Sequence, residues 1–232
     1  MTAVAIITAR GGSKRIPRKN IRPFLGRPII DYSIQAALRS ELFDEVMVST
    51  DDDEIADIAQ TEGAKVPFRR SPEMSGDHAT TAEVLNEVLR EYRSRGCIFE
   101  YACCIYPTAP FVTDERLRAA FERLTESGAD CAIPVARFSF PIRRAFEMEH
   151  GRISYIWPEH APTRSQDLAP AYHDAGQFYF FRTAALLESG QLVGPNTIGL
   201  ETDELEVQDI DTEQDWQLAE LKYRLLMDRG AR

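Results

Sequence analysis

Short apolar runs alternate along this chain with longer stretches in which apolar residues recur every three or four positions. The short runs have the length and apolar content of buried strands, and they occupy residues 3–8, 45–49, 101–106 and 131–136. The longer stretches have the spacing of amphipathic helices, and they occupy residues 30–38, 55–62, 82–92 and 115–124. Such alternation predicts βαβ units and a mainly parallel sheet with helices on both faces. The predicted fold class is therefore α/β.

The alternation is interrupted in residues 138–170, where aromatic residues and prolines show no helical period. Within this segment, Glu149-His150-Gly151-Arg152 predicts a hairpin turn between two short strands. A strand at residues 177–181 and a last helix at about residues 213–227 follow. We therefore expect a single domain, residues 1–232, with an irregular insertion of the kind that forms a lid or an oligomer arm.

The composition is that of an ordinary globular protein, with 44% hydrophobic and 28% charged residues. The net charge of −10 argues against nucleic-acid or membrane-surface binding, since either needs a broad basic face. No run approaches the roughly 20 apolar residues of a membrane span, and no signal-peptide pattern is present, so we expect a cytoplasmic protein. Cys97, Cys103, Cys104 and Cys131 form no Cys-x-x-Cys pair, and we interpret them as buried strand thiols.

A cationic loop follows the first predicted strand of this acidic chain. Within ten positions the loop carries five basic residues, Arg10, Lys14, Arg15, Arg18 and Lys19. The adjacent Gly11 and Gly12 let backbone N–H groups approach an anion closely. Because open α/β sheets bind ligands at strand ends, the position of the loop favours a polyphosphate site over a solvated basic turn. The glycine spacing matches neither a Walker loop nor a dinucleotide fingerprint, which disfavours an ATPase or a dehydrogenase.

Two carboxylates lie far down the chain, at Asp209 and Asp211. If their segment is a strand, both project from one face, and such a pair suits Mg²⁺ held together with substrate phosphates. The alternative is that Asp211 or Thr212 only caps the last helix. Together with the cationic loop, the carboxylate pair predicts a metal–triphosphate site. We interpret the run Asp51–Asp53 as a helix N-cap cluster, with a metal role as the weaker alternative.

A third cluster, between residues 163 and 179, is dense in hydrogen-bonding side chains and leads into a predicted strand, as a polyol-binding wall would. Arg164 could bind a substrate carboxylate through two hydrogen bonds. His173 lies beside Asp174 and near Gln177, and it fits a substrate contact and a structural role equally well.

The loop, at Ala9–Lys14 and Lys19-Asn20, resembles the signature of the sugar-activating cytidylyltransferases, the CMP-sialic acid synthetase group. Further matching segments follow in order over nearly the whole chain, at Val48–Asp51, Arg70–Thr81, Pro107–Pro110 and Gln208–Asp211. Four stretches look most like members that act on pseudaminic acid: Lys14–Ile16, Cys103–Tyr106, Arg164–Leu168 and Tyr172–Gly176. Tyr106 and Ala175 stand where members that act on N-acetylneuraminate usually have Gln and Asn, which favours pseudaminate.

The resemblance implies a Rossmann-like nucleotidyltransferase fold and transfer of CMP from CTP to the anomeric hydroxyl of a nine-carbon 2-keto sugar acid, with Mg²⁺ as cofactor. The implied CTP contacts are Ala9, Arg10, Gly11, Gly12, Ser13, Lys14, Lys19, Asn20, Arg70 and Thr81. The implied catalytic residues are Arg10, Lys19, Asp209 and Asp211, of which the two aspartates hold the metal. The candidate sugar contacts are Tyr106, Arg164, Gln166, Tyr172, His173, Asp174 and Gln177.

The resemblance also implies a homodimer, with the β-rich insertion in residues 138–170 as the dimer arm. Three alternatives remain open at this point. In the first, the reaction is the same but the sugar acid is N-acetylneuraminate, legionaminate or Kdo. In the second, the protein is a non-catalytic nucleotide-binding module. In the third, it is a glycosyltransferase. The run Asp51-Asp52-Asp53 nominally satisfies the Asp-x-Asp pattern of the last class.

Overall fold

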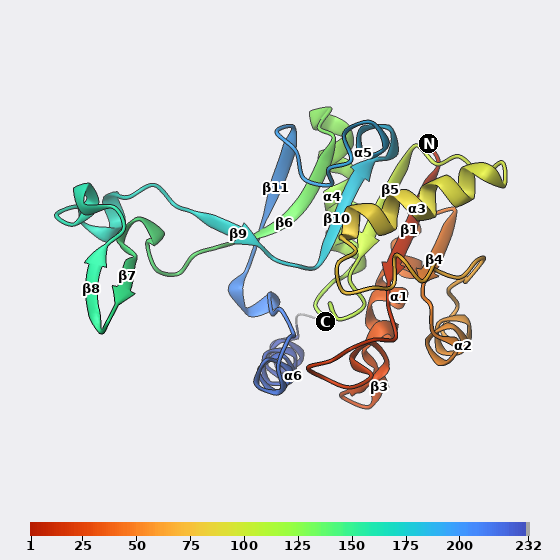
Figure 1. Ribbon diagram of the computed structural model, residues 1–232, viewed down its shortest axis with the longest axis horizontal. Helices are drawn as coiled ribbons and strands as arrows, with labels where there is room; N and C mark the ends of the chain where they lie inside the picture. The colour runs from red at the N-terminus through yellow and green to blue at the C-terminus, as the bar shows by residue number, and fades with distance from the viewer. Residues whose placement is uncertain (231–232) are drawn as a thin grey trace.

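A seven-stranded sheet forms the centre of the molecule, shown in Figure 1 as a computed structural model that describes residues 1–230. The strand order is β11-β6-β10-β5-β1-β4, and β9 pairs with β6. The bounds are β1 Ala3–Thr8, β4 Glu45–Ser49, β5 Tyr101–Ile105, β6 Cys131–Arg137, β9 Tyr172–Asp174, β10 Phe178–Arg182 and β11 Thr197–Thr202. β1 is parallel to β4 and β5, and β11 is parallel to β6, whereas β10 is antiparallel to both neighbours. The predicted α/β fold with a mainly parallel sheet is confirmed.

Within residues 1–230 the chain forms six α-helices: α1 Ile29–Ser40, α2 Asp53–Thr61, α3 Thr81–Ser94, α4 Asp114–Ser127, α5 Thr183–Ser189 and α6 Glu213–Asp228. Four of them were predicted from the apolar spacing and α6 was predicted as the last helix, whereas α5 and the edge strand β11 were not predicted. α5 has only 7 residues, too few to show a helical period. The sequence of β11 contains Gly199 and polar residues, which hide the strand pattern.

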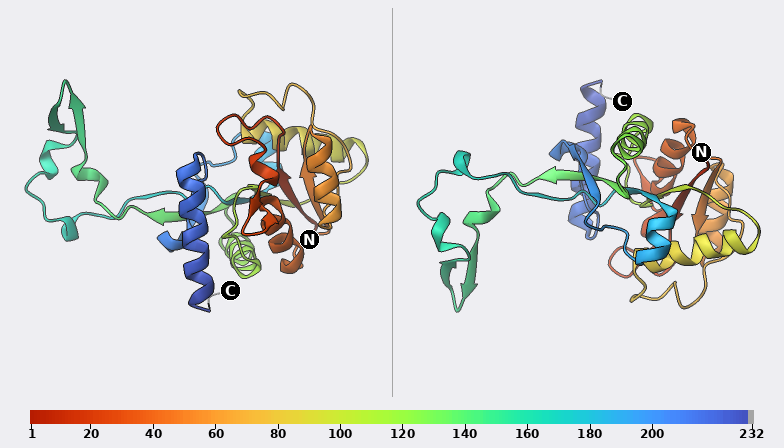
Figure 2. Two further views of the ribbon diagram at one scale, coloured as in Figure 1. Left: turned by 90° about the horizontal axis from the view of Figure 1, so that it is seen from below. Right: turned by 90° about the horizontal axis from the view of Figure 1, so that it is seen from above.

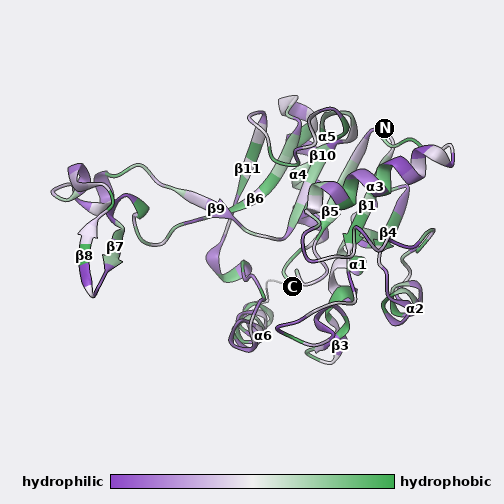
Figure 3. Cartoon of the chain, viewed as in Figure 1, coloured by the Kyte–Doolittle hydropathy of each residue, from purple (hydrophilic) through white to green (hydrophobic). Residues whose placement is uncertain are grey.

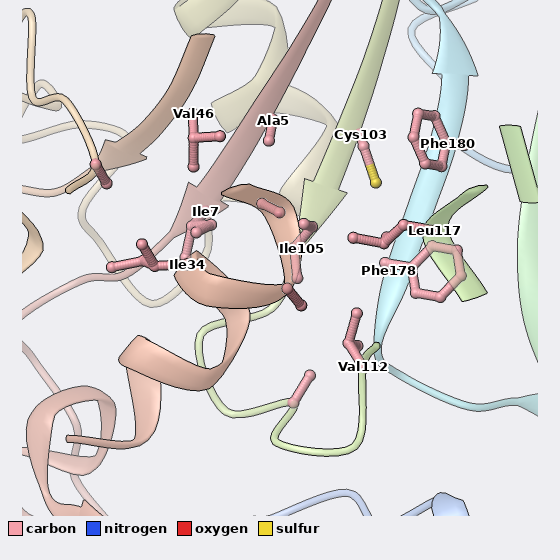
Figure 4. Close-up of a cluster of buried hydrophobic side chains, with 14 of the residues drawn as sticks. Ala5, Ile7, Ile34, Val46, Cys103, Ile105, Val112, Leu117, Phe178 and Phe180 are labelled. Carbon is pink, nitrogen blue, oxygen red and sulfur yellow. The ribbon is translucent and has the colours of Figure 1, made fainter. Parts of the chain in front are cut away.

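The sheet separates two apolar layers. Side chains that alternate along β1 enter opposite layers: Ala5 and Ile7 pack with α1, α2 and α4, whereas Val4 and Ile6 pack with α3 and α5. Figure 3 shows the central strands as mostly hydrophobic, and Figure 4 shows the first layer, where residues of β1, β5 and β10 gather with residues of α1 and α4. Each fully buried Val or Ile contributes about 1.5–3 kcal/mol to stability, so this core fixes the strand ends that carry the loops.

Three of the four cysteines lie in this core. Cys103, Cys104 and Cys131 are buried, and Cys97 after α3 is exposed, all as free thiols. Burial raises the pKa of Cys104 and of Cys131 to about 12, so both thiols stay protonated at neutral pH. The interpretation as buried strand thiols is confirmed for these three residues and is wrong for Cys97.

The segment 138–170 forms an arm that projects from the sheet between β6 and β9, as Figures 1 and 2 show from three directions. Its end is the predicted hairpin, formed by β7 Phe146–Glu149 and β8 Arg152–Tyr155. His150 and Gly151 make the turn with positive φ angles of 48° and 77°. Two extended connections join the arm to the sheet.

A third apolar cluster joins the cationic loop to α6. Ile16 of the loop and Ile210 pack there with Phe24 and with Trp216 of α6. The segment around Asp209 and Asp211 is not the strand that we considered, because residues 207–211 pair with no neighbouring strand. Ile210 packs in this apolar cluster instead.

Short elements complete the chain. The 3₁₀ helices are η1 Lys19–Ile21, η2 Ile142–Arg144, η3 Pro158–His160, η4 Ser165–Asp167 and η5 Glu204–Glu206, and the two-residue strands are β2 Pro23–Phe24 and β3 Arg27–Pro28. Among the helices of residues 1–230, none has the length and apolar character that a membrane crossing requires.

Candidate functional site

The cationic loop is fixed to carboxylates that follow β4. The Gly11 N–H donates a hydrogen bond to Asp51 Oδ1 at 3.0 Å. The guanidinium of Arg18 binds both carboxylate oxygens of Asp52, and Asp52 also caps the N-terminus of α2. The predicted N-cap role is therefore confirmed for Asp52. Hydrogen bonding by Arg18 lowers the pKa of the Asp52 carboxyl, and Arg18 is a structural cation of the loop.

Gly11 is required by this close packing. A Cβ at Gly11 would meet Asp52 Oδ2 at 2.7 Å, and that oxygen is held by Arg18. We expect Gly11→Ala to lower the free energy of unfolding by about 1–3 kcal/mol, the usual cost of overpacking. Urea unfolding followed by circular dichroism measures this. Gly12→Ala is the matched control, since among the described residues a Cβ at Gly12 would meet nothing within 4 Å beyond its two chain neighbours. Equal losses for both variants would show that the contact with Asp52 is not the cause.

A cavity of about 430 Å³ opens beside the loop. It is lined by Thr8, Arg10, Ser13, Lys14, Arg15, Ile16, Lys19, Asn20, Tyr106, Pro107, Thr108 and Asp211. Four of the five loop cations thus face one space, and Arg18 does not. Arg10 Nη1 lies 2.8 Å from Asp77 Oδ1, and Lys14 Nζ binds the other oxygen of Asp77. Hydrogen bonds from Lys14 and Arg10 lower the pKa of this carboxyl.

The other predicted CTP contacts lie around this cavity in supporting positions. Ala9 is buried and extends the β1 pairing to the Ser49 carbonyl, and Asn20 donates a hydrogen bond to the Arg10 carbonyl at 2.9 Å. Arg70 is buried and binds the side chain and the carbonyl of Ser49. Burial lowers the pKa of its guanidinium. These residues hold the strand ends on which the loop rests.

The two aspartates flank Ile210, whose side chain is fully buried. Asp211 Oδ1 lies 2.7 Å from Arg15 Nη2 and 3.4 Å from Lys19 Nζ. Lys19 also donates a hydrogen bond of 2.6 Å to the Ile210 carbonyl. Burial, followed by the negative charge on Asp211, raises the pKa of the Asp209 carboxyl. In the part of the chain that the structure describes, no three His, Cys, Asp or Glu residues gather as a metal cluster.

A second cavity, of about 520 Å³, adjoins the first at Tyr106. It is lined by Tyr106, Ala136, His173, Asp174, Ala175, Gly176, Tyr179, Glu204, Val207, Gln208, Asp209 and Lys222. The Tyr106 hydroxyl and Thr81 Oγ1 are 3.1 Å apart, which ties α3 to the junction. Asp211 lines the first cavity and Asp209 the second. The carboxylate pair therefore stands where the two spaces meet.

Tyr179 and Lys222 line the second cavity and were not predicted as site residues. The Tyr179 hydroxyl donates a hydrogen bond of 2.6 Å to Asp174 Oδ2, which fixes the orientation of that carboxylate. Lys222 of α6 donates to the carbonyls of Glu204 and Val207, and burial lowers the pKa of its amine. The strand pattern around Tyr179 was a usable signal, whereas the sequence gives no sign that Lys222 approaches this cavity.

The remaining predicted sugar contacts do not gather at these cavities within one chain. Arg164 lies on the arm and pairs with Asp167 at 2.7 Å, and Gln166 lines a separate cavity at the base of the arm. The Tyr172 hydroxyl donates a hydrogen bond to Glu201 Oε2. Gln177 is buried, with its amide bound to the Glu206 carbonyl.

Residues 4–191 match the family described as Cytidylyltransferase. This chain belongs to that cytidylyltransferase family. The pseudaminic acid cytidylyltransferase of Campylobacter jejuni subsp. jejuni serotype O:2 is 42% identical to it over 226 residues, 97% of each chain. The CMP-N,N'-diacetyllegionaminic acid synthase of Legionella pneumophila is 31% identical and covers 95% of each chain.

Solved structures share the fold of this chain. CMP:2-keto-3-deoxy-manno-octonic acid synthetase, complexed with CTP, matches with a TM-score of 0.70 at 18% identity, over 98% of this chain and 100% of that one. A 4-diphosphocytidyl-2C-methyl-D-erythritol synthase matches with a TM-score of 0.67 at 16% identity, over 95% of this chain and 98% of that one. These similarities confirm the predicted nucleotidyltransferase fold, and the family assignment makes the protein a nucleotidyltransferase enzyme.

Proposed function

We propose that this cytidylyltransferase transfers CMP from CTP to the anomeric hydroxyl of pseudaminic acid, a nine-carbon 2-keto sugar acid, and releases pyrophosphate. The observation that carries the proposal is the pair of adjoining cavities, one lined by loop cations and the other by hydroxyl and carboxylate groups. Tyr106 and Ala175, the positions that favour pseudaminate in the sequence, both line the second cavity. The C. jejuni relative named for pseudaminic acid supports the same choice of sugar.

In the proposed reaction the oxygen of the anomeric hydroxyl attacks the α-phosphorus of CTP, and the hydroxyl proton is released to solvent. The bond from that phosphorus to the oxygen that bridges to the β-phosphate breaks, and pyrophosphate leaves with the electron pair. Negative charge therefore grows on the leaving group. Arg10, Lys14 and Lys19 are fixed cations at the edge of the first cavity, and they stabilise this charge more in the transition state than in the ground state.

The residues present fit Mg²⁺ as the cofactor of this reaction. Burial, followed by the nearby charge on Asp211, raises the pKa of Asp209, and a divalent cation bound between the two carboxylates would offset both effects. One or two carboxylates with substrate phosphates are the usual ligands of Mg²⁺. When bound, Mg²⁺ would neutralise phosphate charge and acidify the attacking hydroxyl.

Within the second cavity, Tyr106, His173 and Asp174 are the proposed sugar contacts of the same chain, since all three line it. Tyr179 holds the Asp174 carboxylate in place for a sugar hydroxyl. Gln177 supports the wall from behind, through its bond to the Glu206 carbonyl.

The contacts of Asp51, Asp52 and Asp53 disfavour the glycosyltransferase alternative, which relied on their Asp-x-Asp pattern. Asp51 accepts the Gly11 N–H, Asp52 caps α2 and binds Arg18, and Asp53 pairs with Arg69 at 2.6 Å. Each carboxylate of the Asp-x-Asp run is thus already engaged by the protein.

Pyrophosphate release from CTP and Mg²⁺ tests the proposed function, with pseudaminate, N-acetylneuraminate, legionaminate and Kdo assayed in parallel. Release with pseudaminate alone supports the whole proposal. Release with another sugar acid instead would keep the reaction and overturn the choice of sugar. CTP binding without release from any of the four would favour a non-catalytic nucleotide-binding module.

We further propose that the enzyme is a homodimer in which the arm, residues 138–170, packs against a second copy. The hairpin of the arm exposes apolar side chains that its own chain leaves uncovered, among them Met148, 73% exposed, and Ile153, 59% exposed. These two residues are opposite each other across β7 and β8. Arg164 and Gln166 would then reach a sugar from the arm of the neighbouring subunit.

Sedimentation velocity at micromolar concentration tests the dimer. We expect the wild type to sediment as a dimer and the double variant Met148→Glu, Ile153→Glu as a folded monomer, because buried carboxylates oppose the apolar contact. Leu221→Glu on α6 is the matched control, since Leu221 is equally exposed but lies off the arm. A monomeric wild type would remove the dimer from the proposal.

A further inference from the structure

Arg15 is a loop cation that the residues implied for CTP binding do not include. It lines the first cavity together with Arg10, Lys14 and Lys19, and its side chain is 66% exposed. Its guanidinium nevertheless binds Asp211, with Nη2 2.7 Å from Oδ1. The phosphate side of the site and the carboxylate side are thus joined by a direct ion pair.

The pairing is built into the fold. Ile16 follows Arg15 and Ile210 precedes Asp211, and both isoleucines are buried in the same apolar cluster with Trp216. Lys19 Nζ adds a bond to the Ile210 carbonyl at 2.6 Å. Arg15 and Asp211 are therefore held next to each other by their neighbours in sequence, although 196 separates their residue numbers (211 − 15).

Arg15 and Lys19 both bind the same oxygen, Oδ1 of Asp211. A cation held by Asp209 and Asp211 must coordinate the Asp211 carboxylate, to which Arg15 and Lys19 are already bound. Lys19 has a second partner in the Ile210 carbonyl, and its side chain is 20% exposed. Arg15 has the greater freedom, because its exposed side chain can turn from Asp211 into the cavity.

We propose that Arg15 exchanges partners: it holds Asp211 in the metal-free enzyme and turns to the triphosphate when a divalent cation binds Asp211. The inference rests on the proposed function, since it requires both a metal at the aspartates and phosphates at the loop. In the free enzyme Arg15 keeps the carboxylate next to the phosphate loop and offsets its charge. With metal and CTP bound, the same guanidinium donates to phosphate oxygens, for which its fork of N–H groups is suited.

The test is Arg15→Gln, assayed by two readouts for which we expect changes of opposite sign. Mn²⁺ binding to the free enzyme, followed through the electron paramagnetic resonance signal of unbound Mn²⁺, should become about three-fold tighter, because a competing cation and an exposed ion pair are removed. The KM for CTP at saturating Mg²⁺ should rise about ten-fold, because a charged hydrogen bond to phosphate is lost. Arg15→Lys keeps the charge and should lie between the wild type and Arg15→Gln in both readouts.

Arg22→Gln is the matched control. Arg22 forms a two-bond pair with Glu213, two positions after Asp211, but it does not line the cavity, so neither readout should change. Unchanged or weaker Mn²⁺ binding in Arg15→Gln overturns the proposal, and so does an unchanged KM for CTP. Asp211→Asn distinguishes failure of the proposed metal site from failure of the proposed exchange of partners. If it leaves Mn²⁺ binding intact, the metal site of the proposed function fails; if only Arg15→Gln lacks its effect, the exchange of partners fails alone.

Discussion

Asp211→Asn is expected to lower kcat by a factor of about 10² or more while the protein remains folded. The substitution keeps the shape of the side chain and removes the charge that would hold Mg²⁺ against the phosphates, and the loss of one electrostatic group of this kind costs about 10²–10³ in rate. The fold does not depend on that charge, because Ile210 carries the packing of the segment. Steady-state pyrophosphate release at saturating CTP and sugar measures the effect.

Asp228→Asn serves as its control, since this carboxylate lies exposed at the last residue of α6. Its kcat should equal that of the wild type. A kcat for Asp211→Asn within a few-fold of the wild type, with the melting temperature unchanged, would remove Asp211 from the chemistry.

Arg10→Gln should have the second large effect, a fall in kcat/KM for CTP of about 10- to 100-fold. Arg10 lines the first cavity, and its guanidinium already binds a carboxylate, that of Asp77. A charged hydrogen bond contributes about 1.5–3 kcal/mol, and each 1.4 kcal/mol is a factor of ten. The loss should appear in kcat as well as in KM, because charge on the phosphates increases in the transition state.

Initial rates over a range of CTP concentrations, at saturating sugar, measure both constants. Arg224→Gln is the control, because Arg224 forms an exposed pair with Glu220 on α6 and faces neither cavity. A CTP titration of Arg10→Gln that overlays the wild type would show that the loop does not bind the triphosphate.

The sequence was sufficient for those features that depend on neighbouring residues. The period of apolar residues predicts the central strands and the long helices, because each element needs only its own pattern to bury one face. The cationic loop is equally visible, since its charges are consecutive or nearly so. The hairpin turn at His150-Gly151 follows from the local preference of these positions for positive φ.

Features that depend on distant pairing were hidden. Nothing near Asp77 in the sequence indicates that it lies between Arg10 and Lys14, because that contact joins segments more than 60 positions apart. Lys222 approaches the second cavity only because α6 packs across the loop cluster. Arg164 belongs to the segment predicted as the arm, but the sequence does not show that the arm carries it away from both cavities of its own chain.

The position of β10 in the sheet has a consequence for the synthesis of this protein. β10 fills the gap between β5 and β6, so β5 has an open edge until the arm and β9 have been made and β10 has left the ribosome. At about 5–20 residues per second this interval lasts several seconds, during which unpaired N–H and C=O groups of an apolar strand face the cell interior. The nascent chain is therefore exposed to aggregation during this interval, and a slow passage of the ribosome through the arm would lengthen it.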